Sequence, residues 1–269
     1  MSVTDNVFTG SIPALYDQYL GSLLFQPYAS DIAGRLTDLT GGRLLETAAG
    51  TGIVTRALAA ALFDQVQIVA TDLNQPMLDH AATHLSSSRV TWQQADALNL
   101  PFEDALFDRV VCQFGIMFVP DKLKAYQEAL RVLKPGGSFI FNVWDKIEEN
   151  EFARLVAEAV KALFPQNPPM FLGRTPYGYH NQETIRDELL KTGFSGVKSE
   201  TIVCRSRASS PSHPAIGYCQ GTPLRGEIEA RGVSCLQEAT DAATEAIASR
   251  FGIGAVDGKI QAHVIVAYR

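Results

Sequence analysis

The segment LLETAAGTGIV, residues 44–54, predicts a buried strand that turns through a tight loop into a helix. Its apolar run ends in an acid, Glu46, and mostly small residues follow before Ile53. Gly50 and Gly52 have no Cβ, so they permit a sharp turn and a close approach of a ligand to the backbone. The helix N-terminus behind the loop favours a negatively charged ligand group. By itself the loop also fits a plain strand-to-helix turn.

Short apolar runs alternate with helix-length amphipathic stretches around and beyond this loop. The expected strands cover 43–48, 66–72, 90–96, 107–114 and 138–144, and the expected helices cover 53–62, 75–85 and 121–133. Strands that are apolar on both faces and separated by helices are typical of a parallel sheet with helices on both sides. We therefore predict an α/β fold of the doubly wound, Rossmann-like kind.

The rest of the chain extends this sheet to a mostly parallel, seven-stranded one with an antiparallel last strand. Further helices are expected at Ile12–Tyr19, 27–36, 150–163, 182–191 and Leu236–Ile247, and further strands at 196–206 and Lys259–Arg269. Neither an internal repeat nor a flexible linker interrupts the chain, so a single domain is favoured. Its expected parts are a helical cap at 1–40, the sheet core at 41–206 and 259–269, and a helical lid insertion at 207–258. An oligomer contact or plain filling would also account for so long an insertion.

Two further acids follow the second and third expected strands. Asp72 comes twenty residues after Gly52, where a carboxylate can take both ribose hydroxyls of a nucleotide. Asp96 follows the third strand. Ligands of open α/β sheets bind at the carboxyl ends of the strands, which is where both acids and the glycine loop are expected. Each acid alone could be a solvated strand-end residue or a helix cap, but the three features together favour a nucleotide-like ligand.

Four segments give the chain a resemblance to a known family: LLETAAGTG at 44–52, VATDLNQPMLDHA at 69–81, QQADALNLPFEDALFD at 93–108 and LRVLKPGGSFIF at 130–141. In their order and spacing, the chain is similar to the class I S-adenosylmethionine-dependent methyltransferases of the small-molecule kind, such as those of ubiquinone and menaquinone biosynthesis. The resemblance is continuous over about 43–144 and much weaker beyond. It departs from the family pattern at Ala48, where the first of three glycines usually stands.

The resemblance implies S-adenosylmethionine as the cofactor. The methionine end would lie against Glu46 and the 48–52 loop. Asp72 would accept hydrogen bonds from the ribose hydroxyls, and Asp96 would accept one from the adenine amino group, with the backbone of Ala97 beside it. The implied cofactor-binding residues are Tyr19, Glu46, Ala48, Ala49, Gly50, Gly52, Asp72, Leu73, Met77, Asp96, Ala97, Gln113 and Phe114.

Four members of this set complete the expected cofactor site. Leu73 and Met77 would pack against the adenine. Gln113 and Phe114, at the end of the fourth strand, would lie near the methionine or the ribose.

Aromatic residues define the expected acceptor site. Tyr16 and Tyr19 are three residues apart on the first helix, so their rings would share a face. In this family such a helix commonly covers the cofactor, and an aromatic ring attracts a cation such as the sulfonium; packing onto the core is the alternative. The expected acceptor-site residues are Tyr16, Phe118, Trp144, Tyr218 and Thr222. They favour a planar or lipophilic small molecule.

The implied reaction is an in-line displacement that moves the sulfonium methyl group to an oxygen, carbon or nitrogen atom of the acceptor. No residue is assigned a catalytic role, although His180 and His213 are candidates for a base. Two alternatives stay open. A nicotinamide-dependent Rossmann oxidoreductase would need glycine at position 55, where this chain has Thr55. A cofactor-binding partner subunit without catalysis would share the same motifs.

The composition excludes several other classes of protein. Of 269 residues, 46% are hydrophobic and 19% charged, which suits a sizeable core and excludes a disordered chain. The net charge is −6 and no basic run is present, which argues against nucleic acid as a partner. His80 and His84 stand four residues apart, but without a HExxH pattern or a third ligand nearby we expect no metal site.

The cysteines and the N-terminus predict a cytoplasmic protein. The four cysteines are scattered, which is typical of reduced thiols. The first twenty residues lack the basic and apolar regions of a signal peptide. No apolar run approaches the ~20 residues that span a bilayer, so no integral membrane association is expected. A homo-oligomer is compatible with the sequence.

Overall fold

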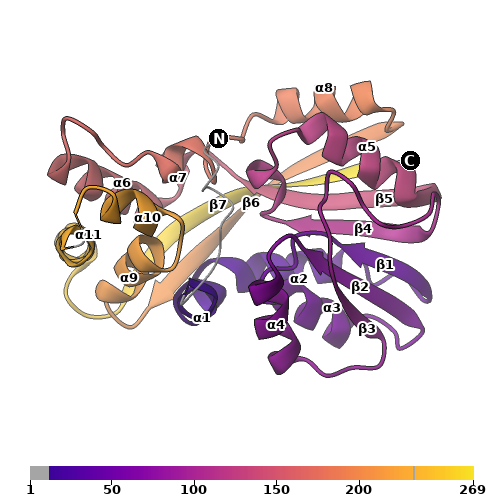
Figure 1. Cartoon of the computed structure of the whole chain (residues 1–269), viewed down its shortest axis with the longest axis horizontal. Coiled ribbons are helices and arrows are strands. Elements are labelled where there is room, and N and C mark those ends of the chain that lie inside the picture. Colours follow the sequence, from indigo (N-terminus) through magenta and orange to yellow (C-terminus); the bar gives the residue numbers. More distant parts are fainter. Residues whose placement is uncertain (1–11, 233) are drawn as a thin grey trace. The chain divides into compact units, whose positions relative to one another are not determined.

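The computed structural model describes residues 12–232 and 234–269. Within them, seven strands form one sheet in the order β3-β2-β1-β4-β5-β7-β6 (Figure 1). The strands are β1 (Gly42–Glu46), β2 (Val66–Asp72), β3 (Val90–Gln94), β4 (Phe107–Gln113), β5 (Leu133–Trp144), β6 (Gly196–Ala208) and β7 (Val256–Tyr268). The predicted seven-stranded sheet is therefore confirmed.

The first five strands form the parallel part of the sheet. β1 pairs with β2 and β4, β2 with β3, and β4 with β5, all in parallel. β7 runs antiparallel to β5. Hydrogen bonds join Gly137 to Arg269 and, further along β5, Asp145 to Gln261, so residue numbers rise on one strand as they fall on the other. The predicted antiparallel last strand is confirmed by this register.

The chain divides into two compact units, which we call the sheet unit and the helical unit. Among the described residues, the sheet unit comprises 26–143, 180–202 and 262–269, and the helical unit comprises 12–25, 144–179, 203–232 and 234–261. Strands β5, β6 and β7 contribute residues to both units. The single domain with a cap and a lid stays a prediction, and the first eleven residues of that cap lie outside the described residues.

Helices cover both faces of the sheet unit: α2 (Gln26–Gly34), α3 (Ile53–Ala61), α4 (Gln75–His84), α5 (Lys122–Val132) and α8 (Gln182–Thr192), with the 3-10 turn η2 (Ile116–Phe118) after β4. The connections from β1 through α3 and α4 move towards one edge of the sheet, whereas the connection from β4 through α5 moves towards the other. Because such crossovers are right-handed, these two sets lie on opposite faces. α2 packs against α3, and α5 packs against α8 (Figure 1).

The helical unit contains α1 (Ile12–Tyr16), the π-helix η1 (Asp17–Phe25), η3 (Ile147–Glu149), α6 (Glu151–Leu163), α7 (Phe171–Arg174), α9 (Ser212–Gln220), α10 (Leu224–Glu229) and α11 (Cys235–Phe251). α11 packs against α6 and α9, and α9 packs against η1. A Cβ at Gly217 would overlap the side chain of Leu20, so glycine lets α9 and η1 approach closely. The segment expected as a lid thus supplies three helices to the core of this unit.

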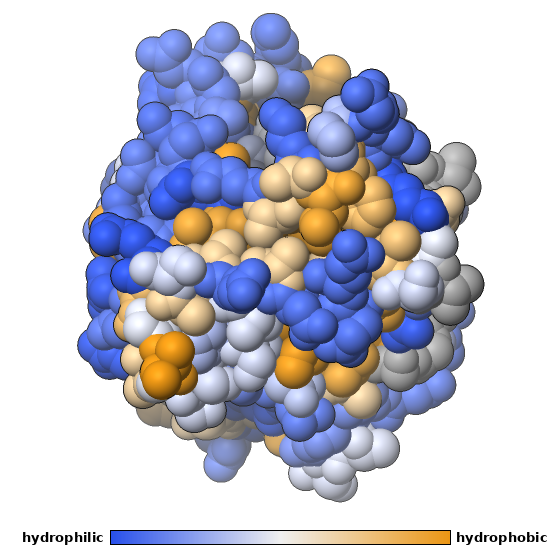
Figure 2. All heavy atoms as spheres, turned by 90° about the vertical axis from the view of Figure 1, so that its left-hand side faces the viewer, coloured by the Kyte–Doolittle hydropathy of each residue, from blue (hydrophilic) through white to orange (hydrophobic). Residues whose placement is uncertain are grey.

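The surface of the helical unit mixes polar and apolar side chains. Figure 2 shows the face that carries α6, α10 and α11, with apolar side chains among hydrophilic ones. Met170 and Ile253 are exposed apolar residues of this unit. Among the described residues, no helix combines the length and the apolar character needed to cross a membrane. The four cysteines are free thiols.

Candidate functional site

The loop after β1 is held in a left-handed turn at the centre of the sheet unit. Ala48, Gly50 and Gly52 have φ of 57°, 56° and 79°. The Ala49 N–H donates to Thr71 O at 2.8 Å, which ties the loop to the end of β2. The turn therefore opens beside the carboxyl ends of β1 and β2, as the sequence predicts.

Ala48 is the position where the family pattern usually has glycine. A left-handed conformation costs a non-glycine residue roughly 1–2 kcal/mol. The methyl group fits because its neighbour is Gly115, where an added Cβ would overlap the Ala48 Cβ. Glycine at 115 thus makes room for alanine at 48.

Glycine occurs at positions 50 and 52 of the loop for different structural reasons. A Cβ at Gly52 would lie 2.9 Å from the Trp92 ring and 3.0 Å from Ala81 Cβ, so glycine there serves the packing of β3 and α4. A Cβ at Gly50 would meet nothing within 4 Å. Gly50 therefore offers the open approach to the backbone that the sequence assigns to both.

Asp72 closes the loop from the end of β2. Its Oδ2 accepts from Gly50 N at 2.8 Å and its Oδ1 accepts from Asn74 N at 2.8 Å. The side chain is buried, with the residue 7% exposed. Burial raises the pKa of Asp72, while the N–H groups of Asn74 and Gly50 act in the opposite direction. Asp72 Oδ1 also accepts from Asn74 Nδ2 at 3.4 Å, whereas Oδ2 has a second lone pair that could accept from one further donor.

Glu46 lies beneath the same loop at the end of β1. The residue is 1% exposed, and its Oε2 accepts from Thr55 Oγ1 at 2.6 Å. Burial and, to a smaller extent, the charge of Asp72 raise the pKa of Glu46 to about 8, so at neutral pH the carboxyl group holds a proton. A positively charged ligand group beside it would favour the carboxylate. The sequence shows only that position 55 is not glycine, and gives no sign of this contact between Thr55 and Glu46.

The residues expected around an adenine lie at the ends of β2 and β3. Leu73 is 44% exposed, whereas Met77 on α4 is buried. Asp96 is exposed, and its Oδ1 accepts from Leu98 N at 2.9 Å, which forms a tight turn after β3. Ala97 lies within that turn and is half-buried. Leu73 and Asp96 thus present accessible groups, whereas Met77 is enclosed by protein.

β4 ends in a strained residue. Phe114 follows Gln113 and has φ of 49° although it carries a side chain. Its N–H donates to Asn142 Oδ1 on β5 at 2.9 Å, and its ring meets Tyr28 edge-on at 5.3 Å between centroids. Such strain clusters at functional sites. Phe118, on η2, is half-buried.

An aromatic cluster runs through the helical unit. Tyr16 stacks on Phe25 at 4.9 Å, Phe25 meets Trp144 at 6.2 Å, and Trp144 meets Tyr177 at 5.9 Å between ring centroids. The hydroxyls of Tyr177 and Tyr218 are 3.2 Å apart, and burial raises the pKa of Tyr218. The structure therefore joins three of the expected acceptor-site residues and adds Phe25 and Tyr177, which no sequence pattern signalled.

Tyr19 and Thr222 lie in the same unit with other contacts. The Tyr19 ring packs against His213 at 4.9 Å, and His213 Nε2 donates to Tyr19 O at 3.1 Å. Because the chain is a π-helix from Asp17 on, Tyr16 and Tyr19 contact different partners. Thr222 Oγ1 donates to Tyr218 O at 2.7 Å and accepts from Leu224 N, so its hydroxyl joins α9 to α10.

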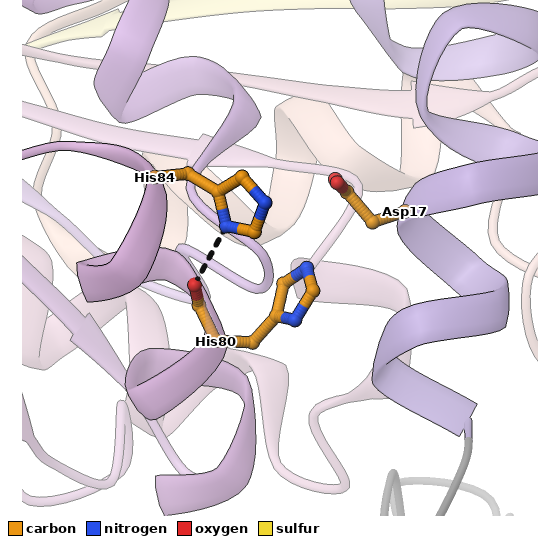
Figure 3. Close-up of side chains that lie close together, drawn as sticks. All are labelled: Asp17, His80 and His84. Carbon is orange, nitrogen blue, oxygen red and sulfur yellow. Dashed lines mark hydrogen bonds between the residues drawn. The ribbon is translucent and has the colours of Figure 1, made fainter.

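His80 and His84 stack on one side of α4 (Figure 3). His84 Nδ1 bonds to His80 O at 2.9 Å, which uses one ring nitrogen within the helix. The expectation that no metal binds at these histidines stays a prediction. Asp17, also drawn in Figure 3, belongs to the helical unit.

Comparison with known proteins agrees with the geometry. A family model described as a methyltransferase domain matches residues 45–141. The demethylmenaquinone methyltransferase of Clavibacter sepedonicus is 32% identical over 174 residues, 61% of this chain and 70% of the relative. The ubiquinone/menaquinone biosynthesis C-methyltransferase of Pseudomonas savastanoi pv. phaseolicola is 30% identical over 187 residues, 65% and 72% of the two chains. The fold is similar to phosphoethanolamine N-methyltransferase 2 of Haemonchus contortus, with a TM-score of 0.60 at 20% identity over 96% of this chain and 56% of that one.

Proposed function

This chain belongs to the S-adenosylmethionine-dependent methyltransferases, and from that premise we propose that it methylates a small, planar, lipophilic acceptor. The cofactor is S-adenosylmethionine. The observation that supports a cofactor site in the sheet unit is the open approach to Gly50 beside two buried acids. Gly50, Glu46 and Asp72 are the residues that would hold the group.

The charges of these residues fit the cofactor. Asp72 Oδ2 accepts from Gly50 N and keeps a lone pair that suits a ribose hydroxyl, whereas Oδ1 accepts from the N–H and the side-chain amide of Asn74. Glu46 is buried at the end of the neighbouring strand, where it would balance a positive charge of the methionine part. Asp96 and Leu73 are exposed at the ends of β3 and β2, which suits an amino group and an apolar ring face.

When bound, S-adenosylmethionine supplies a methyl group already activated by a positive sulfur. The residues of this chain then need mainly to orient the two reactants and exclude water, which together contribute several powers of ten to the rate. We propose transfer by in-line displacement, in which the acceptor atom forms a bond to the methyl carbon as the carbon–sulfur bond breaks. The proton that the acceptor loses goes to a base that we leave unassigned.

The aromatic cluster of the helical unit supports the acceptor class. Tyr16, Phe25, Trp144 and Tyr177 offer flat apolar faces, and the paired hydroxyls of Tyr177 and Tyr218 offer hydrogen bonds to an oxygen on a ring. The two relatives above are named for quinone biosynthesis. We therefore propose a hydroxylated aromatic ring of the demethylquinol kind, methylated on carbon or oxygen.

The alternative of a nicotinamide-dependent oxidoreductase has a structural argument against it. In that fold a third glycine lets the helix pack closely on the strand. Here Thr55 fills this position and donates to Glu46. A calorimetric titration separates the two functions, because S-adenosylhomocysteine should bind with a Kd of about 1 µM or tighter, about −8 kcal/mol, and NADH should give no heat. Binding of NADH without S-adenosylhomocysteine would overturn the cofactor assignment.

The acceptor class has its own test. Labelled S-adenosylmethionine is incubated with the protein and either reduced demethylmenaquinone or phosphoethanolamine. Label should pass to the quinol. Transfer of label to phosphoethanolamine and not to the quinol would contradict the proposed acceptor. Transfer to the quinol that does not depend on the enzyme would contradict it as well. If the protein binds S-adenosylhomocysteine but transfers no label to a panel of small aromatic acceptors, the result would favour the alternative function of a non-catalytic partner subunit.

A further inference from the structure

Asn142 carries a buried donor that the described part of the protein does not use. It lies on β5 and is 0% exposed. Its Oδ1 accepts from Phe114 N at 2.9 Å. Its Nδ2 has no hydrogen-bond partner among the described residues. An unsatisfied buried donor costs about 1–3 kcal/mol, and an acceptor supplied by a bound ligand would remove this cost.

The orientation of this amide is fixed by its neighbour. The Phe114 N–H is a donor and requires an oxygen opposite it. Exchanging the oxygen and nitrogen of Asn142 would bring two donors together at 2.9 Å. Nδ2 is therefore the atom that points away from Phe114.

Asn142 is placed at the ligand-binding edge of the sheet. It is the register partner of Gln113, so their side chains lie side by side on one face at the carboxyl ends of β5 and β4. Along this edge the strands follow in the order β2, β1, β4, β5. Asp72 ends β2 and Glu46 ends β1, so acids occupy one half of the edge and an amide donor the other.

This distribution of charge matches an amino acid group. A ligand that carries both an ammonium and a carboxylate is drawn with its ammonium towards Asp72 and towards Glu46, which the ammonium would favour as a carboxylate, and its own carboxylate is repelled by Asp72. Asn142 offers N–H donors at the half of the edge farther from the acids. A hydrogen bond between a neutral donor and a carboxylate is stronger than one between neutral groups.

We propose that Asn142 Nδ2 donates a hydrogen bond to the carboxylate of the methionine part of the cofactor. The proposal rests on the cofactor site assigned above to the sheet unit. Asn142 acts as a binding residue, and Phe114 holds its amide in the orientation that binding needs.

The test compares two ligands that differ only in the carboxylate: S-adenosylhomocysteine, and its decarboxylated analogue, which keeps the ammonium. The variant is Asn142→Asp, which retains an oxygen for the Phe114 N–H and replaces the NH2 group by a second oxygen. Asn181→Asp is the matched control, because this N-cap of α8 also accepts from a backbone N–H and the charge change is the same.

Calorimetry should show that Asn142→Asp weakens S-adenosylhomocysteine binding at least 10-fold and leaves the decarboxylated analogue within about 3-fold. Asn181→Asp should change neither. An equal loss for both ligands would mean that the loop at Phe114 is distorted, and unchanged affinity for both would mean that Nδ2 does not bind the carboxylate; either result overturns the proposal. Unchanged affinity with reduced transfer to reduced demethylmenaquinone would assign Nδ2 to the acceptor and also overturn it.

Two further measurements keep the outcome clear. If Asn142→Asp fails to fold by circular dichroism, Asn142→Ala replaces it, because the Phe114 N–H also has the backbone O of residue 142 as an acceptor at 3.2 Å. The same selective loss is expected from that variant, and a non-selective one contradicts the proposal. Failure of the wild-type protein to bind S-adenosylhomocysteine at all would refute the cofactor site itself.

Discussion

Replacing Glu46 by glutamine should make the protein more stable at alkaline pH. Glu46 is 1% exposed, and burial raises the pKa of its carboxyl group from 4.5 to about 8. Glutamine has nearly the same shape and keeps an oxygen that can accept from Thr55 Oγ1. Glu46→Gln therefore removes the ionisable group and leaves the hydrogen bond.

The sign and size of the effect follow from proton linkage. Below pH 4.5 both the folded and the unfolded state hold the proton, so this group adds no pH dependence. Between pH 4.5 and 8 the unfolded state has released its proton while the folded state keeps it, so the free energy of unfolding falls as pH rises. At about 1.36 kcal/mol for each unit of pKa, the total loss is on the order of 5 kcal/mol and is complete above pH 8.

The assay is urea unfolding of the wild type and Glu46→Gln at pH 5 and pH 8.5. The two proteins should differ little at pH 5, and the variant should be more stable by several kcal/mol at pH 8.5. Glu103→Gln, at an exposed glutamate, is the matched control and should follow the wild type at both values. If Glu46→Gln and the wild type show the same dependence on pH, the carboxyl group is ionised in the fold and the reasoning from burial is wrong.

Four further variants probe the other parts of the site. Asp72→Ala removes charge-assisted hydrogen bonds worth ~1.5–3 kcal/mol. Calorimetry should therefore show that S-adenosylhomocysteine binds 10- to 100-fold more weakly, while the circular dichroism of the protein is unchanged. Unchanged affinity would mean that Asp72 is only a strand-end residue. Gly52→Ala brings a Cβ to 2.9 Å from Trp92 and should lower the free energy of unfolding by about 1–3 kcal/mol more than Gly50→Ala, whereas Gly50→Ala should lose more cofactor affinity. The reverse order in either measurement would contradict the division of roles. Tyr218→Phe should reduce transfer to reduced demethylmenaquinone with S-adenosylhomocysteine affinity unchanged, and full transfer would exclude its hydroxyl from acceptor binding.

The sheet unit could be predicted well because its signals are local. The helix expected at 121–133 is α5, and Asp121 caps it by accepting from Lys124 N at 2.9 Å. The strand expected at 66–72 has the same bounds in the structure. Apolar runs, caps and glycines within a few residues of each other were sufficient for these elements.

Other features of the same unit depend on neighbours that are distant in sequence. In the motif, nothing distinguishes Gly52 from Gly50. The difference comes from Trp92, forty residues later, which packs against Gly52. The departure at Ala48 is explained by Gly115, which lies between β4 and η2. Asn142 looks like one polar residue in an apolar strand, and only the register with β4 shows that its amide holds Phe114.

The helical unit shows why the cofactor was easier to name from the sequence than the acceptor. The expected cofactor residues lie at the ends of strands that are consecutive in the chain, so each can be located from the strand pattern of the sequence. The aromatic cluster is instead assembled from α1, η1, the end of β5, α9 and the segment after α7, and its spacing along the chain follows no period. Tyr177 lies in a Pro- and Gly-rich stretch that gave no signal, yet it connects Trp144 to Tyr218. Because such a cluster can change one segment at a time without disturbing the strand ends, the same cofactor half can be combined with different acceptors, and the acceptor has to be established by assay.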